Sequence, residues 1–541
     1  MTQDLSKMQI KGIPDPWKDG IAAGWKVIDG ATLNQDLDIE GDVVIIGSGA
    51  GGAVSAEIFS QAGLKVVMVE AARLKSTHAF DMNEGDAYRD LYQEGATRMT
   101  KDTAISILQG RAVGGTTVVN WTSCFRTPEQ VLDHWSQRYA TEGLSSSEMA
   151  PWFERMEQRL NISKWIVPPN FNNAIIRDGA KKLGWHWDAI PRNVDGCWNI
   201  GYCGTGCPTN AKMSMLVTTL PEAMNAGATL VHSAEAWKLE HDGTRVSAVT
   251  CRALNAGKKP SGHRVRLRAP VIIAAGGGIN TPGLLLRSQV PDPHNRVGAR
   301  TTLHVVSTAF GVFDEEVAGY YGAPQSVYSD EFVWRDGVTG KLGYKIEVMP
   351  VHPGVTSVLM DVPGPRHAEE MRELPNLSIG LALMRDGFHE QSQGGRVELR
   401  DDGSPVVDYP LGDYMMEGVR AGILSQAEMY FAAGARKVRA RHADAGWHTS
   451  WQAAREEIRN LNYAAHYVPL GSAHVMGGCA MGEDQTLCAT NSNGRYHHLD
   501  NLYVFDGSLF PTSLGVNPQL SIYGIVAKLA SELASGLTSE V

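Results

Sequence analysis

A single histidine, His474, lies in the glycine- and methionine-rich stretch SAHVMGGCAMG at residues 472–482. An imidazole exchanges its proton near neutral pH, so this side chain could take the proton of a hydroxyl group or hold that hydroxyl by a hydrogen bond. The small residues around it would let the loop pass close to a bound group. A structural histidine that serves packing alone is the alternative interpretation.

A second motif, GSGAGG at residues 47–52, has the G-x-G-x-x-G spacing of a dinucleotide-binding turn. Gly47 would permit the tight turn, Gly49 would let the backbone approach a pyrophosphate, and Gly52 would let a helix pack on a strand. The N-terminus of that helix then offers free N–H groups to the phosphates. A chance glycine-rich turn is the alternative.

The neighbours of this turn strengthen the dinucleotide interpretation. The β-branched run at 42–46 predicts a strand before it, and residues 64–70 predict another strand after an intervening helix, which makes a β-α-β unit of about 30 residues. Glu70 ends the second strand, where its carboxylate could accept hydrogen bonds from ribose hydroxyls and would disfavour a 2′-phosphate. NAD and FAD both bind to such a unit, so the motif alone does not choose between them.

Two further glycine-rich stretches could belong to a site. GRAVGGTTVVNW at residues 110–121 carries Arg111 and Asn120, with a plain surface loop as the alternative. Cys197, Cys203 and Cys207 form a C-x5-C-x3-C pattern that matches no standard zinc or iron–sulfur spacing. A three-cysteine metal site is one interpretation; we predict reduced cysteines in a tight loop and no metal ligands.

The elements that must position these residues are predicted from the hydrophobic pattern. Residues 270–278 and 501–508 predict two more buried strands, and the C-terminal apolar pattern predicts a helix that begins at Pro518 and is capped at Gly536. Residues 300–460 show strand-like segments followed by helical ones, which indicates an α+β domain inserted between parts of a nucleotide-binding domain.

Composition limits the class of protein. The chain of 541 residues is 43% hydrophobic and 20% charged, as in an ordinary water-soluble protein of more than one domain. A net charge of −10 argues against nucleic acid as a partner. The N-terminus lacks an apolar stretch of signal-peptide length, so we expect a cytoplasmic protein in which peripheral membrane contact stays open.

Taken together, these motifs resemble those of the glucose–methanol–choline (GMC) oxidoreductases, which bind FAD. GSGAGG with Glu70 is similar to the N-terminal FAD fingerprint of the family, and GRAVGGTTVVN is similar to its segment near the flavin. APVIIAAGGGINTPGLLLRSQV at residues 269–290 resembles its second signature. HVMGGCAMG with the later NLYVFDGSLFPTSLGVNPQLSIYGIVAKLA resembles its C-terminal block.

The resemblance implies a fold and a cofactor. The expected fold class is α/β: a Rossmann-like FAD-binding domain with an inserted α+β substrate domain of antiparallel sheet and helices. The absence of a histidine in the 110–120 region implies that FAD is not covalently attached. The expected FAD-binding residues are Gly47, Ser48, Gly49, Ala50, Gly52, Glu70, Ala71, Arg111, Gly114, Gly115, Asn120, Trp121, Ala236, Ala275, Gly276, Asp506, Gly507, Asn517, Pro518 and Gln519.

The resemblance also implies two catalytic residues. It gives His474 the role of base, or of the group that orients the hydroxyl, and it gives Asn517 a hydrogen bond to the substrate oxygen. Asn517 precedes Pro518, so a helix cap is its structural alternative. The helix that follows could stabilise negative charge on the reduced flavin.

Weaker candidates have structural alternatives as well. Asp506 resembles a family contact near the flavin ribityl chain, or is an ordinary strand-end aspartate. Asn120 and Trp121 line the flavin or pack in the core. Glu347 is an acidic partner in the substrate pocket, or a solvated or salt-bridged strand residue. His352 and His466 are predicted to be structural.

The resemblance therefore implies FAD-dependent oxidation of an alcohol to an aldehyde or ketone. The chain departs from the family pattern at HVMG and at Ala480, and its closest motifs are those of long-chain alcohol oxidase and cholesterol-oxidase-like branches, so we expect a hydrophobic alcohol. The electron acceptor could be oxygen, a quinone or an electron-transfer protein. A lyase of the same fold and a non-catalytic flavin-binding protein are the alternatives.

The expected domain organisation follows the order of the motifs. The predicted segments are an N-terminal extension at 1–40, the FAD-binding domain at 41–165, 201–300 and 461–541, a substrate-domain segment or loop at 166–200, and the substrate-binding domain at 301–460.

Overall fold

Six short strands form a fully parallel sheet in the computed structural model of the chain, which describes residues 12–539. The strand order is β1-β9-β4-β3-β13-β24. The four central strands are buried throughout or nearly so, as expected for a parallel sheet covered on both faces. The strands are β1 (Lys26–Asp29), β9 (Thr229–His232), β4 (Val66–Val69), β3 (Val43–Ile46), β13 (Val271–Ala274) and β24 (Leu502–Val504).

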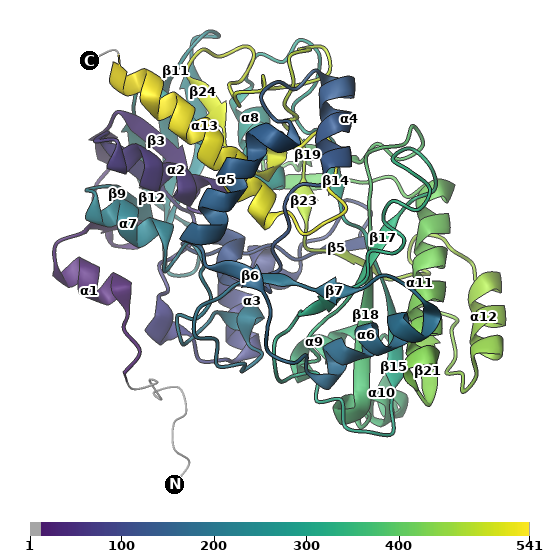
Figure 1. Ribbon diagram of the computed structural model, residues 1–541. Coiled ribbons are helices and arrows are strands. Elements are labelled where there is room, and N and C mark those ends of the chain that lie inside the picture. Colours follow the sequence, from purple (N-terminus) through teal and green to yellow (C-terminus); the bar gives the residue numbers. More distant parts are fainter. Residues whose placement is uncertain (1–11, 540–541) are drawn as a thin grey trace.

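Helices cover this sheet and connect its strands. The predicted β-α-β unit is present: β3 leads into α2 (Ala50–Gln61), which returns to β4. The C-terminal helix α13 (Gln519–Ser539) packs on α2 and α5 (Ser146–Arg159), as Figure 1 shows. By length and composition alone α13 could cross a membrane, but 61% of its most apolar window is buried in the described fold.

Both predicted ends of α13 need correction. Its first helical residue is Gln519, and Ile522 N–H donates to the Pro518 carbonyl, so Pro518 stands just outside the helix. The helix does not end at Gly536 but continues to Ser539. Gly536 does not adopt the left-handed backbone that a glycine cap requires.

A small sheet beside the parallel one was not predicted. Its order is β10-β11-β12-β2, antiparallel except for the parallel pair of β12 and β2. The strands are β2 (Leu37–Glu40), β10 (Ala234–His241), β11 (Val246–Leu254) and β12 (Pro260–Arg268).

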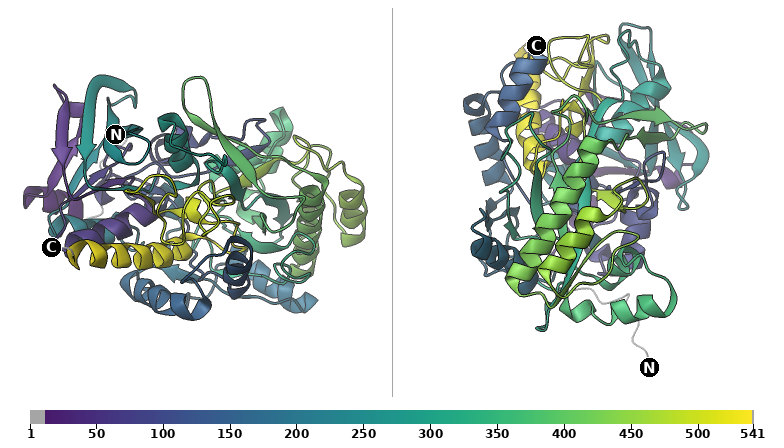
Figure 2. Two further views of the ribbon diagram at one scale, coloured as in Figure 1. Left: turned by 90° about the horizontal axis from the view of Figure 1, so that it is seen from above. Right: turned by 90° about the vertical axis from the view of Figure 1, so that its right-hand side faces the viewer.

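The predicted α+β region is present as a second, mostly antiparallel sheet with helices on one face. Its order is β17-β18-β15-β22-β5, and β21 also pairs with β15. Helices α11 (Asp413–Ala433) and α12 (Trp451–Asn460) lie over it, in green in Figures 1 and 2. The strands are β5 (Ile105–Ile107), β15 (Val306–Val312), β17 (Tyr344–Val348), β18 (Leu377–Met384), β21 (Lys437–Ala440) and β22 (Leu470–Ser472). The predicted fold class is therefore confirmed.

Two strands of this second sheet, β5 and β22, come from segments that we assigned to the FAD-binding domain, and they pair with each other in parallel. A further sheet, β20-β19-β14-β23, likewise joins segments on both sides of residue 460. Its strands are β14 (Ala299–Leu303), β19 (Gly395–Leu399), β20 (Pro405–Asp408) and β23 (Val475–Met476). The domain limits stay a prediction.

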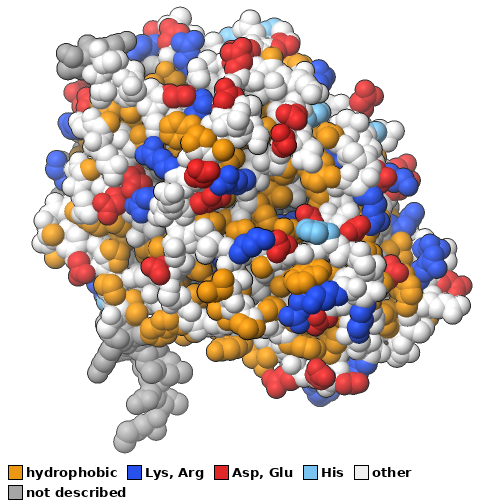
Figure 3. Space-filling view, viewed as in Figure 1, with side chains coloured by type: hydrophobic (Ala, Val, Ile, Leu, Met, Phe, Trp, Pro, Cys, Tyr) orange, Lys and Arg blue, Asp and Glu red, His pale blue; other side chains and the backbone are white. Residues whose placement is uncertain are grey.

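Shorter elements complete the chain. Two-stranded pairs are formed by β7 (Asp188–Ala189) with β16 (Val327–Tyr328) and by β6 (Ile162–Lys164) with β8 (Pro191–Asn193). The remaining α-helices are α1 (Pro16–Ala22), α3 (Glu84–Leu91), α4 (Glu129–Tyr139), α6 (Phe171–Leu183), α7 (Thr219–Asn225), α8 (Gly277–Ser288), α9 (Pro353–Leu359) and α10 (Gly364–Met371). Acidic and basic side chains are interspersed over the face shown in Figure 3.

Candidate active site

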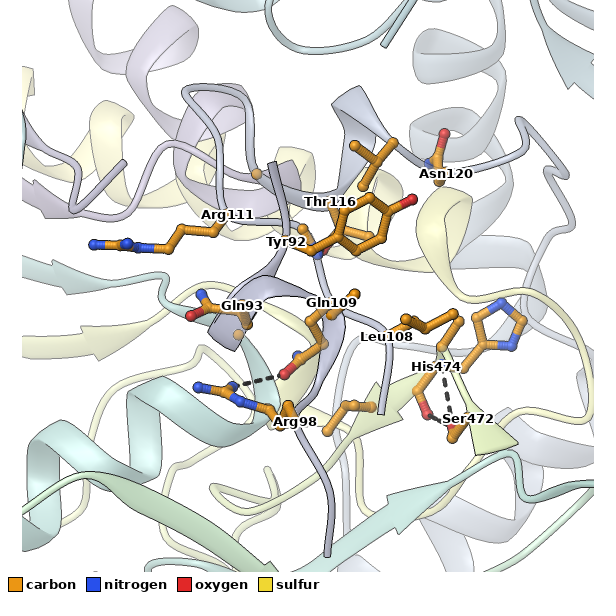
Figure 4. Close-up of a pocket in the computed structure, with 18 of the residues that line it drawn as sticks. Tyr92, Gln93, Arg98, Leu108, Gln109, Arg111, Thr116, Asn120, Ser472 and His474 are labelled. Carbon is orange, nitrogen blue, oxygen red and sulfur yellow. Dashed lines mark hydrogen bonds between the residues drawn. The ribbon is translucent and has the colours of Figure 1, made fainter. Parts of the chain in front are cut away.

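A cavity of about 1080 Å³ is lined from both the parallel and the antiparallel sheet. All of the predicted site residues line it except Ser48, Gly52 and Gly114. Figure 4 shows part of its wall, with Arg111 on one side and His474 on the other. The cavity therefore joins the dinucleotide motif to the C-terminal histidine loop.

The glycine turn between β3 and α2 forms one end of the cavity. Gly47 has φ +100, and a Cβ there would lie 2.5 Å from the Ala275 carbonyl oxygen. Gly52 does not line the cavity, because it packs against the Gly47 carbonyl. A Cβ on Gly52 would lie 2.0 Å from the Gly47 carbonyl oxygen. Gly49 precedes α2 without a side-chain cap, so the first-turn N–H groups are available to phosphates.

A second glycine turn touches the first. Gly115 lies in a left-handed conformation, φ +58, and a Cβ there would stand 2.6 Å from the Gly49 Cα. Gly114 lies behind this contact, where its N–H donates to Ser48 Oγ at 3.0 Å. The two motifs thus form one cradle of bare backbone.

Glu70 links this cradle to the neighbouring strand. Its Oε2 accepts from Ser48 N and Ser48 Oγ at 3.1 and 2.8 Å, and its Oε1 accepts from Ala72 N at 2.8 Å. Ser48 is fully buried, so it orients the carboxylate and does not face the cavity. Oε1 keeps a lone pair that a ribose hydroxyl can use.

Asn120 supplies an unpaired acceptor on the cavity wall. Its Nδ2 donates to Gln519 Oε1 at 2.7 Å, while its buried Oδ1 has no partner among the described residues. Gln519 in turn donates to the Ser123 carbonyl at 2.8 Å. A buried orphan acceptor fits a cofactor N–H or hydroxyl group at this position.

Asp506 lines the cavity but its carboxylate is already engaged. Oδ2 accepts from Gly277 N and Thr281 Oγ1 at 2.7 and 2.6 Å, and Oδ1 accepts from the backbone and hydroxyl of Ser508. Four bonds fill a carboxylate. This geometry favours the structural interpretation of Asp506 over a side-chain contact with the cofactor.

The remaining predicted cofactor residues line the cavity or contribute backbone groups to its wall. Arg111 Nη2 donates to the Ala71 carbonyl at 3.2 Å, and the Ala236 carbonyl accepts from Arg287 at 3.4 Å. The others that line the cavity are Ala50, Trp121, Ala275, Gly276, Gly507 and Pro518.

His474 stands at the other end of the cavity, between β22 and β23. Its backbone N–H donates to Ser472 Oγ at 3.3 Å, and its Nδ1 lies 3.0 Å from Nδ1 of His304. Burial lowers the pKa of His474 to about 4, with Lys345 lowering it further and Glu347 opposing. The imidazole is therefore neutral at neutral pH.

Asn517 does not cap its own helix. Its Oδ1 accepts from Lys345 Nζ at 3.0 Å and its Nδ2 donates to Glu347 Oε2 at 3.3 Å. One N–H of the amide stays available to the cavity that Asn517 lines. The cap alternative is therefore wrong in this structure.

A buried ion pair on β17 lies behind Asn517. Lys345 Nζ is 3.0 Å from Glu347 Oε1, and both side chains are at most 1% exposed. Gln325 Nε2 also donates to Glu347 Oε2 at 2.8 Å, and Lys345 Nζ stands 3.2 Å from the centre of the Phe125 ring. Burial lowers the pKa of Lys345. Glu347 is thus both the predicted salt-bridged strand residue and part of the cavity wall.

Three polar residues beside His474, Asn517 and Glu347 were not predicted from the sequence. His304, Lys345 and Gln325 lie in no motif, and only the alternation of Lys345 and Glu347 along one strand could have suggested a common face.

Neither the three clustered cysteines nor His352 and His466 belong to a candidate ion site within residues 12–539. Among residues 12–539 no group of three or more His, Cys, Asp or Glu side chains is arranged to bind an ion, so the three-cysteine site has no support. Cys203 is buried and its Sγ accepts from Arg192 at 3.8 Å. His352 lines the cavity, stacked on Tyr202 at 4.5 Å, and His466 lines it too.

One part of the cavity wall is apolar. Val306 of β15 stands opposite Leu383 of β18, and Leu381 two residues before it faces the same cavity. Met349 and Leu359 continue this wall. The cavity therefore combines a polar end at His474 with room for an apolar group.

Comparison with known proteins decides the family. The sequence model of the GMC oxidoreductases matches residues 88–306 with its N-terminal part and residues 390–525 with its C-terminal part. The chain belongs to the GMC oxidoreductase family. It is an oxidoreductase, and FAD, the expected cofactor, is confirmed.

Relatives agree with this assignment. The GMC-type oxidoreductase Rv0492c of Mycobacterium tuberculosis (strain ATCC 25618 / H37Rv), whose printed name calls it uncharacterized, is 31% identical over 91% of this chain and 75% of its own length. The long-chain-alcohol oxidase FAO3 of Arabidopsis thaliana is 26% identical over 94% of this chain and 70% of its own.

A solved structure agrees in fold. Formate oxidase of Aspergillus oryzae RIB40 superimposes with a TM-score of 0.70 at 13% identity, covering 94% of this chain and 100% of that one. At this identity the likeness concerns the fold alone.

Proposed function

We propose that this GMC oxidoreductase oxidises an alcohol with an apolar body to an aldehyde or ketone. The observation that carries the proposal is that His474 and Asn517 line one cavity together with the dinucleotide cradle. These groups come from segments far apart in the chain. Their convergence on one cavity with the cofactor cradle is the arrangement that hydride removal from a C–H bond requires.

FAD, when bound, supplies the flavin N5 that accepts the hydride. The chain's own residues manage the hydroxyl group. Asn517 offers an amide N–H to the substrate oxygen, and its orientation is fixed by Lys345 and Glu347. Two groups at this end can accept a proton: His474, the base that the sequence predicts, and the carboxylate of Glu347.

The apolar wall supports a hydrophobic alcohol. Val306, Leu381 and Leu383 lie on adjacent strands, so they form one continuous face beside the polar end. Burial of a substrate chain against this face contributes about 0.8 kcal/mol for each CH₂ group. The relative that is named a long-chain-alcohol oxidase points to the same class.

Attachment, acceptor and location are parts of the proposal. Non-covalent FAD agrees with Asn120 and Thr116, which stand on the cavity wall in the 110–120 region where the sequence has no histidine. Oxygen, a quinone or an electron-transfer protein receives the electrons. Cytoplasmic location and peripheral membrane contact stay predictions.

Anaerobic mixing of the holoenzyme with a panel of alcohols tests the proposal. We expect bleaching of the visible flavin absorbance, faster with longer apolar primary alcohols than with sugars or choline. Peroxide formation against dye reduction then separates an oxidase from a dehydrogenase. A flavin that no alcohol reduces contradicts the proposal; carbon–carbon cleavage would then indicate a lyase, and no turnover would indicate a flavin-binding protein.

A further inference from the structure

His304, in the connection between β14 and β15, is 1% exposed and meets two backbone donors. Its Nε2 lies 3.3 Å from Leu514 N and 3.1 Å from Gly515 N. A backbone N–H can only donate, so Nε2 must accept both bonds and cannot carry a proton. The proton of the neutral ring is therefore on Nδ1.

That Nδ1–H points to the ring of His474. His304 Nδ1 and His474 Nδ1 are 3.0 Å apart, with the rings nearly perpendicular at 84°. One hydrogen fits between two ring nitrogens, and His304 supplies it. His474 Nδ1 is then the acceptor, so the proton of neutral His474 is on Nε2.

We propose that His304 is a positioning residue that fixes His474 as the Nε2–H tautomer, so that His474 presents a hydrogen-bond donor to the cavity. The proposal rests on the proposed function, because it concerns the group that meets the alcohol. It selects between the two roles that the sequence leaves open: His474 holds the substrate oxygen and does not take its proton.

The reverse arrangement has a conflict at each step. A free lone pair on His474 Nε2 requires a proton on its Nδ1, which would meet the Nδ1–H of His304. Moving the His304 proton to Nε2 would relieve that contact but would place it against the N–H groups of Leu514 and Gly515. Each unpaired buried donor disfavours this alternative.

Burial keeps both rings neutral; Lys345 acts in the same direction, whereas Glu347 opposes it at His474. Lys345 and Glu347 on β17 are the ionised groups that act on His474, and Lys345 acts on His304. Burial lowers the pKa of His304 well below its usual value, as it lowers that of His474. With His474 as a donor, Glu347 is the group at this end of the cavity that can receive the hydroxyl proton. The hydride leaves the carbon of that alcohol for FAD.

Nitrogen-15 NMR of the histidine-labelled, FAD-loaded protein reads the tautomer directly. We expect a protonated Nε2 and an unprotonated Nδ1 for His474, and the opposite for His304, assigned by comparison with the His474→Gln and His304→Asn proteins. His442 is an internal reference, because Asp444 N–H donates to its Nδ1 at 3.0 Å and its Nε2 faces the Asn462 carbonyl. A proton on Nδ1 of His474 overturns the proposal. This readout needs no substrate, so it stands apart from the test of alcohol oxidation.

Two substitutions of His304 and one control substitution add a kinetic test. His304→Leu removes the donor, and we expect flavin reduction to slow about 10-fold to 10²-fold, with the pH dependence of reduction shifted upward. His304→Asn keeps an amide near the Nδ1 position and should restore most of the rate. His442→Asn, a buried histidine outside the cavity, is the matched control and should change neither. Equal rates and pH profiles in the Leu protein and the wild type overturn the proposal; if the Leu protein fails to fold, the NMR of the wild type decides.

Discussion

Lys345 shows how strongly the substrate end of the site depends on one residue without a motif. Its ammonium group pairs with Glu347 and holds the Asn517 amide, and all three side chains are buried. Removing one member of a buried pair leaves the other charge without compensation. The pair therefore sets both the stability of β17 and the orientation of Asn517.

We expect Lys345→Met to lower the free energy of unfolding by about 3–5 kcal/mol, because Glu347 then stays buried without its partner. Urea denaturation of the holoprotein, followed by tryptophan fluorescence, measures this loss. The Lys345→Met/Glu347→Leu protein is the control and should recover much of the stability. A loss below about 1 kcal/mol in the single variant would show that the pair is not buried as described.

The sequence predicted the site residues that lie in motifs and missed the residues that hold them in place. His474 and Asn517 were singled out by the resemblance of their segments to the GMC family motifs. His304 and Lys345 were not, since their partners are 170 and 172 residues away and meet them only in the folded chain. Asp506 was assigned to the cofactor, but four donors from its own surroundings occupy it.

Among the elements, the contact between the β3–α2 turn and the 110–121 segment shapes the cofactor end. Gly49 and Gly115 meet with no side chain between them, and Gly115 has a left-handed backbone. We expect Gly115→Ala to weaken FAD binding at least about tenfold, because the left-handed strain alone is about 1–2 kcal/mol and the new Cβ would press on the Gly49 backbone.

Titration of the apoprotein with FAD, followed by flavin fluorescence, measures this change. Gly63→Ala is the matched control: Gly63 also has a positive φ, +84, but nothing lies within 4 Å of its Cβ position. It should lose some stability and keep its FAD affinity. Equal FAD affinities in the two variants would contradict the role given to the glycine contact.

Helices and strands that carry a local hydrophobic pattern could be predicted from the sequence. The β3-α2-β4 unit, the strands β13 and β24, and the helices α11 to α13 follow from hydrophobic runs and periodicity. The β10–β12 sheet escaped because polar residues interrupt its strands. The pairing of β5 with β22 joins segments more than 360 residues apart, which no local pattern specifies.

For the whole molecule, two partly buried histidines make stability depend on pH. Burial lowers the pKa of His474 and of His134 from 6.5 to about 4. The unfolded chain therefore binds more protons than the folded chain between these values, so stability is lost as the pH falls from 6.5 toward 4.

We expect the free energy of unfolding to decrease over this pH range, and the decrease to be smaller in His474→Gln. Denaturation at a series of pH values measures both slopes. His134→Gln should reduce the slope in the same direction from a position outside the cavity. An identical slope in His474→Gln and the wild type would contradict a lowered pKa at residue 474.

Two claims are central to the proposed function: an alcohol reduces the flavin, and His474 is needed for this reduction. Stopped-flow absorbance under anaerobic conditions, with the wild type, His474→Ala and the best alcohol of the panel, tests both parts together. We predict rapid flavin reduction by the wild type and a rate about 10²-fold lower in the variant, with FAD retained. Equal rates in the two proteins, or no reduction of the wild type by any alcohol, would contradict the proposed function.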